Sequence, residues 1–230
     1  MHVHSIFSFD GLMRIDKLIK ICIKKGLRGV SITDHDTLRG SSEALRIAKD
    51  YENFLVIPGE EISTNYGDIL AYFVQEEIKA ADVYEVIDKI KEQDGLSIIA
   101  HPYECLDRYP VDLLSKIDGV ELFNSRSLFA RSLPDELNNL LKKAKEHNWI
   151  LTAGSDAHLY CEIGRAYIKS DEDISELEEM RHAIEKKRIR IFGVPTPPFV
   201  KIISQLVGCF RAKRWCSLLY YIIPRKFSIR

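Results

Sequence analysis

Histidine and carboxylate side chains gather in short motifs that are spread along this 230-residue chain. No cysteine belongs to any of these motifs. Imidazole and carboxylate ligands without thiolate are typical of zinc, manganese or iron sites that carry out hydrolysis. The candidate metal ligands, each with the run in which it stands, are His2 and His4 (HVH), Asp10 (SFDG), His35 (TDHD), Glu61 (GEE), His101 (AHP), and Asp156 and His158 (SDAH).

The His2-Val3-His4 run predicts two imidazoles that reach one metal ion. Side chains alternate between the two faces of an extended segment, so His2 and His4 lie on the same face. A single His-x-His run is a weak signal. The prediction of a metal site therefore depends on the conjunction of several separate motifs with suitable ligand types.

Short β-branched runs alternate with amphipathic helices along most of the chain, and each polar motif follows directly after a strand. Parallel strands that deliver chemistry at their carboxyl ends are typical of α/β barrels. An open doubly wound sheet concentrates its ligands at one switch point, whereas here they follow many successive strands. The pattern therefore favours a closed barrel. Strands are expected at 29–33, 54–57, 69–74, 96–100, 119–123 and 149–152, and helices at 15–23, 42–51, 82–93 and 134–146.

Charge is unevenly distributed in a chain whose net charge is only −1. From Lys186 to Arg230 there are eleven Lys and Arg and no acid, which leaves 22 basic and 34 acidic residues in 1–185. This segregation predicts a separate role for the tail. A tail helix packed on the acidic barrel is the favoured interpretation, and contact with nucleic acid or with an anionic membrane surface are the alternatives. The apolar stripe of this helix is expected to comprise Phe199, Ile202, Ile203, Leu206, Val207 and Phe210.

The five cysteines are odd in number and form no CxxC pair, so we expect no disulfide framework. No signal peptide stands out, and the longest apolar stretch, Trp215 to Pro224, is too short to span a membrane. We therefore expect a cytoplasmic protein without a transmembrane segment.

The runs HVHS, SFDG, TDHDT, PGEEIS, AHP, ELFN and GSDAH, in this order, resemble the polymerase and histidinol phosphatase (PHP) superfamily of metallophosphoesterases. The resemblance covers about residues 1–193 and implies a distorted, TIM-like seven-stranded β/α barrel. Residues 194–230 are then a basic, partly apolar C-terminal extension. The resemblance also implies two or three divalent ions, commonly manganese, iron or zinc.

The resemblance further implies how the ligands are shared. His2, His4, Glu61 and Asp156 would hold the first metal. Glu61 would bridge to a second, also held by His101. The family's Gly-x-Glu spacing selects Glu61 rather than Glu60. The third metal would be held by Asp10, His35 and His158.

Two features depart from the family pattern. Asp68 stands where many members carry a histidine for the second metal, and it could be a substitute ligand or a strand-start residue. Met1 directly precedes His2, so the strand that carries His2 and His4 is expected to be short.

The predicted function is hydrolysis of a phosphomonoester or of a nucleotide or oligonucleotide phosphodiester. Bound metals lower the pKa of water and supply the attacking hydroxide, so no serine nucleophile is needed. The expected partner is a small phosphorylated substrate or a nucleotide, with Arg126 and Asn124 as candidate substrate-binding residues. The expected catalytic residues are His2, His4, Glu61, Asp156 and His158.

Two alternatives compete with this function. A metal-dependent amidohydrolase also begins its barrel with His-x-His, but those barrels typically use a bridging lysine, and no lysine stands at a strand end here. A degenerate barrel that serves as a binding module is the other alternative, and metal analysis would distinguish it.

Overall fold

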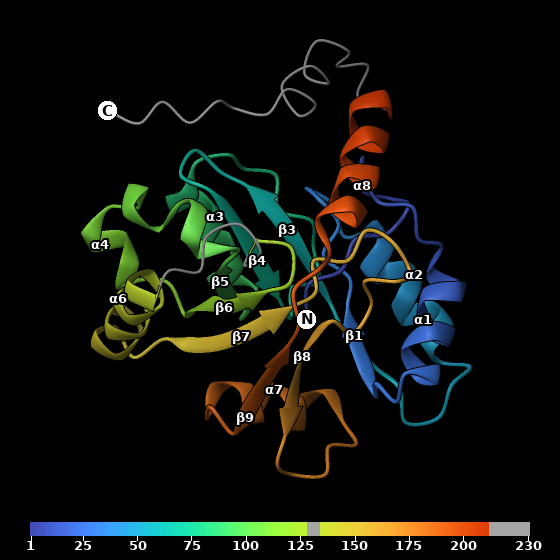
Figure 1. Cartoon of the computed structure of the whole chain (residues 1–230). Helices are drawn as coiled ribbons and strands as arrows, with labels where there is room; N and C mark the ends of the chain where they lie inside the picture. The colour runs from blue at the N-terminus through green and yellow to red at the C-terminus, as the bar shows by residue number, and fades with distance from the viewer. Residues whose placement is uncertain (128–133, 212–230) are drawn as a thin grey trace.

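Helices and strands alternate along the computed structural model, which describes residues 1–127 and 134–211 (Figure 1). The predicted α/β class is confirmed, and the predicted elements appear with ends shifted by a few residues. The strand Gly59–Ser63 and two strands near residues 166–193 were not predicted from the sequence.

The largest sheet has five strands in the order β3-β4-β5-β6-β7. β4 runs antiparallel to both β3 and β5, whereas β5, β6 and β7 are parallel. The prediction of a wholly parallel sheet is therefore wrong at β4. The reason is local, since only a short turn separates β3 from β4, and a turn can join antiparallel strands but not parallel ones. The bounds are β3 Gly59–Ser63, β4 Asp68–Tyr72, β5 Leu96–Ile99, β6 Gly119–Asn124 and β7 Ile150–Gly154.

The remaining strands form two smaller sheets within the described residues. β1 (Gly29–Ser31) pairs in parallel with β2 (Leu55–Ile57), and β8 (Ala166–Ser170) pairs antiparallel with β9 (Ile189–Gly193). The His2–His4 segment is short, as expected, because only Val3 makes a β-bridge, to Ala157.

The closed seven-stranded barrel is not confirmed by this arrangement. The described strands form three separate sheets. Where a closed barrel would have continuous ladders, the structure has the isolated bridges Val3 to Ala157 and His35 to Glu61. The backbone gives a physical reason. Asp36 and Asp156 adopt left-handed conformations, with φ of 54° and 49°, and so interrupt the extended chain where a ladder would continue.

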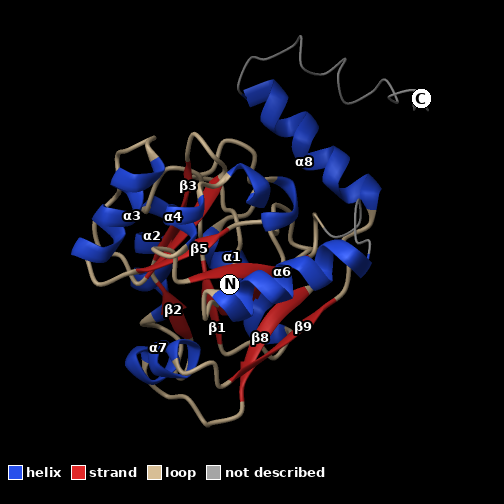
Figure 2. Ribbon diagram, turned by 90° about the vertical axis from the view of Figure 1, so that its left-hand side faces the viewer, coloured by secondary structure: helices blue, strands red, loops and turns tan. Residues whose placement is uncertain are grey.

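Helices cover both sides of this framework (Figures 1 and 2). α1 (Ile15–Lys24) and α2 (Arg39–Ala48) pack beside β1 and β2 around Leu18, Ile32 and Val56. α3 (Val83–Glu92), α4 (Val111–Leu114) and α6 (Pro134–Glu146) cover one face of the five-stranded sheet. The short 3-10 helices Pro102–Glu104 and Leu106–Arg108 follow β5. α7 is Leu177–Glu185 and α8 is Pro198–Arg211.

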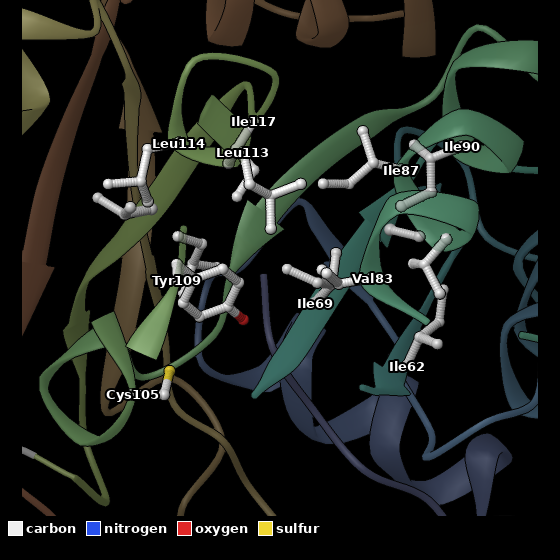
Figure 3. Close-up of a cluster of buried hydrophobic side chains, with 14 of the residues drawn as sticks. Ile62, Ile69, Val83, Ile87, Ile90, Cys105, Tyr109, Leu113, Leu114 and Ile117 are labelled. Atoms are coloured by element: carbon white, nitrogen blue, oxygen red, sulfur yellow. The ribbon is translucent and has the colours of Figure 1, made fainter. Parts of the chain in front are cut away.

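The five-stranded sheet is buried on both faces, which gives the site a rigid base. Ile69 and Ile87 belong to the cluster beneath α3 and α4, shown in Figure 3. The next residue, Leu70, points to the opposite face, where it packs with Ile98 and with Ile184 of α7. Alternation of side chains along a strand explains this division.

Candidate metal centre

The fold brings all eight predicted ligands to one place. His2 and His4 are fully buried, and their Nε2 atoms lie 3.0 Å apart. Each of these nitrogens lies 3.1 Å from Oε2 of Glu61, which extends from β3. Asp156, just after β7, places its Oδ1 3.3 Å from Nε2 of His4. His2, His4 and Asp156 thus form one group able to hold a metal ion.

A second group contains the residues that resemblance assigned to the third metal. His4, Asp10, His35 and His158 have potential ligand atoms that all lie within 4.8 Å of one another. Nε2 of His158 lies 2.8 Å from Oδ2 of Asp10, and Nε2 of His35 lies 3.7 Å from the same oxygen. His4 therefore belongs to two groups at once.

The third group is Glu61, Asp68 and His101. Nε2 of His101 lies 3.0 Å from Oε1 of Glu61 and 3.7 Å from Oδ2 of Asp68. Asp68 begins β4, and the antiparallel pairing of β3 with β4 places its side chain beside that of Glu61. This position supports the ligand interpretation of Asp68, which the sequence left open.

Hydrogen bonds around the imidazoles fit a metal-binding role. Nδ1 of His2 lies 3.1 Å from Oε1 of Glu121, and Nδ1 of His4 lies 3.3 Å from the Ser8 hydroxyl. Such bonds place the ring proton on Nδ1 and leave the Nε2 lone pair for a metal. In His35, the buried Nδ1 atom makes no hydrogen bond. The Nε2 atoms of His2 and His4 face each other beside the carboxylates of Glu61 and Asp156. A cation shared by these atoms would stabilise the arrangement, so the donor set fits divalent metals.

The electrostatics of the cluster keep its carboxylates ionised. Burial favours the neutral form of Glu61, but the charges of His2 and His35 hold its pKa well below the usual range. Burial also opposes protonation of His4, yet hydrogen bonds to Asp156 and Glu61 outweigh it and raise its pKa to about 10, so a metal ion that binds Nε2 would release a proton. Burial lowers the pKa of His158 to about 4, and the charge of His4 adds to this effect. Ionised carboxylates are the form that a metal ion requires.

Two ligand residues sit in backbone conformations that non-glycine residues rarely adopt. His101 has φ 31° and ψ 57°, and Asp156 has φ 49°. Each such residue costs about 1–3 kcal/mol, and such residues concentrate at functional sites. Here the turns after β5 and β7 direct both side chains into the cluster.

The two candidate substrate-binding residues have protein partners. Asn124 is fully buried; its amide donates to Oε2 of Glu121 at 2.8 Å and accepts from the Arg126 backbone N–H at 2.9 Å. Arg126 is only 6% exposed, and its guanidinium lies 2.7 Å from Nδ1 of His158 and 3.1 Å from Oε1 of Glu162. Both side chains thus support the ligands, and their role toward a substrate stays a prediction.

Sequence reasoning missed two buried carboxylates that hold the ligands in place. Glu121 accepts from His2, from Asn124 and from the His101 backbone N–H at 3.0 Å. Glu162 accepts from the backbone N–H groups of His158 and Leu159, both at 2.9 Å. Glu121 stands in the ELFN run, which could have identified it, whereas nothing in the sequence marks Glu162.

Comparison with known proteins agrees with this geometry. The PHP domain model matches residues 1–191. The chain belongs to the PHP family. The recognition made from the sequence motifs is thereby confirmed.

Individual relatives of this PHP protein extend the comparison. An uncharacterized protein of Methanocaldococcus jannaschii is 33% identical over 225 residues, covering 94% of this chain and 87% of its own. A Caldicellulosiruptor bescii protein named "Probable phosphatase" is 26% identical over 73% of this chain and 82% of its own. A two-domain Bacteroides vulgatus protein, described as containing a predicted PHP-like metal-dependent phosphoesterase, shares the fold. Its TM-score is 0.67 at 19% identity, over 84% of this chain and 63% of that one.

Proposed function

We propose that this PHP protein is a metal-dependent phosphoesterase that cleaves a phosphomonoester or a nucleotide or oligonucleotide phosphodiester. One observation carries the proposal. The three potential ligand groups adjoin one another, because His4 belongs to two of them and Glu61 contacts His2, His4 and His101. Neighbouring ions that share ligands are the arrangement that clamps both the attacking and the leaving oxygen of a phosphoryl group.

We propose the following ligand sets for manganese, iron or zinc. His2, His4 and Asp156 hold one ion, and Glu61, Asp68 and His101 hold another. Asp10, His35 and His158, with His4, hold a third. When bound, such ions polarise the phosphoryl oxygens and make water acidic enough to supply hydroxide at neutral pH.

Two buried carboxylates of the chain hold the proposed ligands in position by hydrogen bonds. Glu121 orients His2 through Nδ1 and also fixes the backbone at His101. Glu162 fixes the backbone at His158. The sequence motifs that supply these ligands contain no lysine, which disfavours the amidohydrolase alternative with its bridging lysine. We place the activity in residues 1–193 and treat 194–230 as a separate extension.

The test is a hydrolysis panel with manganese, iron and zinc, using aryl phosphomonoesters, aryl phosphodiesters and nucleotides. Asp156→Asn and His158→Ala are each expected to lower hydrolysis by orders of magnitude and to reduce bound metal, because each removes a ligand. Asp171→Asn is the matched control, since this exposed carboxylate directly follows β8 and pairs with Arg190 of β9. Full activity in either ligand variant, or metal binding with no phosphoester cleaved, would contradict the proposal. The latter result would favour a binding module.

A further inference from the structure

α8 exposes a continuous stripe of large apolar side chains. Their spacing of i, i+3, i+4, i+7 and i+11 places them on one face of the helix. In Figure 2, α8 extends away from the body of the molecule. We call this face the apolar stripe; its members and exposed fractions are Phe199 (66%), Ile202 (50%), Ile203 (46%), Leu206 (40%) and Phe210 (65%).

The apolar stripe is not the face that attaches α8 to the protein. Val200 and Ser204 are the buried positions, at 7% and 1% exposure. The Arg126 guanidinium donates to the Ser204 hydroxyl and, at 3.4 Å, to the Lys201 carbonyl. The helix is therefore anchored through one side while the stripe points elsewhere. The favoured expectation was a tail helix packed on the barrel with its basic residues toward the acidic body. α8 does contact the body through Val200 and Ser204, while the stripe stays exposed. Val207 alone among the predicted members is half-buried.

The sequence that contains the apolar stripe carries basic residues and no acidic residues. From Pro198 to Arg230 the chain has seven Lys and Arg and no acid, and it includes Trp215, Tyr220 and Tyr221. Residues 212–230 lie outside the part of the chain that the structure describes. Among residues 1–127 and 134–211, no helix has the length and apolar character needed to cross a bilayer. An apolar face combined with basic residues is instead characteristic of helices that lie in a membrane interface.

We propose that the apolar stripe of α8 is an interfacial binding face for an anionic lipid bilayer. Apolar side chains enter the boundary between headgroups and acyl chains, while the basic residues of the extension attract the negative surface. The combination of basic and apolar residues favours this occupant over the other two. A nucleic acid gains nothing from exposed Ile202, Ile203 and Leu206, because its phosphates need cationic or polar donors. A symmetric dimer formed stripe to stripe would bring two tails of the same charge together.

The experiment is vesicle co-sedimentation of the full-length protein. Vesicles of phosphatidylcholine alone are compared with vesicles that also contain phosphatidylglycerol, at low and at high salt. We expect binding to the anionic vesicles that weakens with salt. Ile202→Glu combined with Leu206→Glu is expected to lower the affinity at least about tenfold, because burial of each side chain contributes more than one decade. Val111→Glu is the matched control, since Val111 is 78% exposed but lies on α4, and it should bind as the parent does.

Further arms separate the alternatives. Circular dichroism and the melting temperature show whether the double variant folds; if it does not, Phe199→Ser with Phe210→Ser gives the decision. The proposal fails if the parent ignores anionic vesicles at low salt, or if stripe variants bind them as well as the parent. It also fails if the protein binds an RNA oligonucleotide but no vesicles. A dimer seen by light scattering that only stripe variants abolish, without vesicle binding, would identify a second copy as the occupant.

Discussion

At the scale of single residues, Glu121 links the metal ligands to each other. Its two carboxylate oxygens accept from His2, from Asn124 and from the backbone at His101, and its side chain is only 1% exposed. A carboxylate that holds the far nitrogen of a ligating histidine fixes the ring and raises its basicity. The orientation of the candidate ligands therefore depends on a residue outside the three potential ligand groups.

Glu121→Gln is expected to weaken metal binding by about 10–100-fold, because the amide keeps the shape of the side chain but removes its charge. Calorimetric titration with manganese or zinc measures this change. Glu172→Gln is the control, since Glu172 is an exposed carboxylate that pairs with Arg188 at 2.7 Å. Equal affinities for the parent and Glu121→Gln would remove Glu121 from the support of the site.

At the scale of elements, the end of β7 approaches the His2–His4 segment very closely. A Cβ atom built on Gly154 would lie 2.2 Å from Cβ of His2 and 2.3 Å from Oε1 of Glu121. The backbone of Asp156 also donates to the His2 carbonyl at 2.8 Å. Glycine is thus required where β7 packs against the first segment of the chain.

Gly154→Ala is expected to displace His2 or Glu121 and to cost about 1–3 kcal/mol through overpacking. Denaturant unfolding measures the stability, and elemental analysis measures the bound metal, which should fall. Asp82→Ala separates local from general effects. It removes the N-cap of α3, which accepts from the backbone N–H of Tyr84 at 3.0 Å, and should cost about 1 kcal/mol without loss of metal. Retention of full metal content by Gly154→Ala would show that this contact does not position His2.

At the scale of the whole molecule, the candidate ligands are spread from His2 to His158 and come from several different strands and turns. His2 and His158 are separated by nearly the full length of the PHP domain, yet His4 and His158 stack with ring centroids 4.2 Å apart. Such a site exists only in the folded chain. Metal binding and folding are therefore coupled.

Manganese is expected to raise the melting temperature and a chelator to lower it. An ion at 100 times its dissociation constant stabilises the native state by about 2.7 kcal/mol. A chain of this size gains about 2–4 °C for each kcal/mol. Scanning calorimetry measures the shift, with sodium chloride of equal ionic strength as the control. His4→Ala should abolish most of it, and a melting temperature indifferent to manganese and chelator would contradict the metal centre.

Local sequence signals were sufficient to predict much of the secondary structure of this protein. Periodicity and turn residues predicted the helices and most strands, because burial patterns are local. The antiparallel pair β8–β9 escaped prediction, since Ala166–Ser170 and Ile189–Gly193 are only partly buried and lack a clear alternation. The antiparallel direction of β4 was also missed, because the direction of a strand depends on its partners.

The sequence by itself determined the chemistry of the site, because ligand types and their motifs can be read along the chain. Only the tertiary structure decided how the ligands are grouped, that Asp68 joins Glu61 and His101, and that Glu121 and Glu162 hold them. These facts depend on distances between residues far apart in sequence, which no local pattern encodes. The direction in which the apolar stripe of α8 faces was also decided by the tertiary structure. Its spacing was visible in the sequence, but anchoring through Ser204 and Arg126 turned that face away from the core.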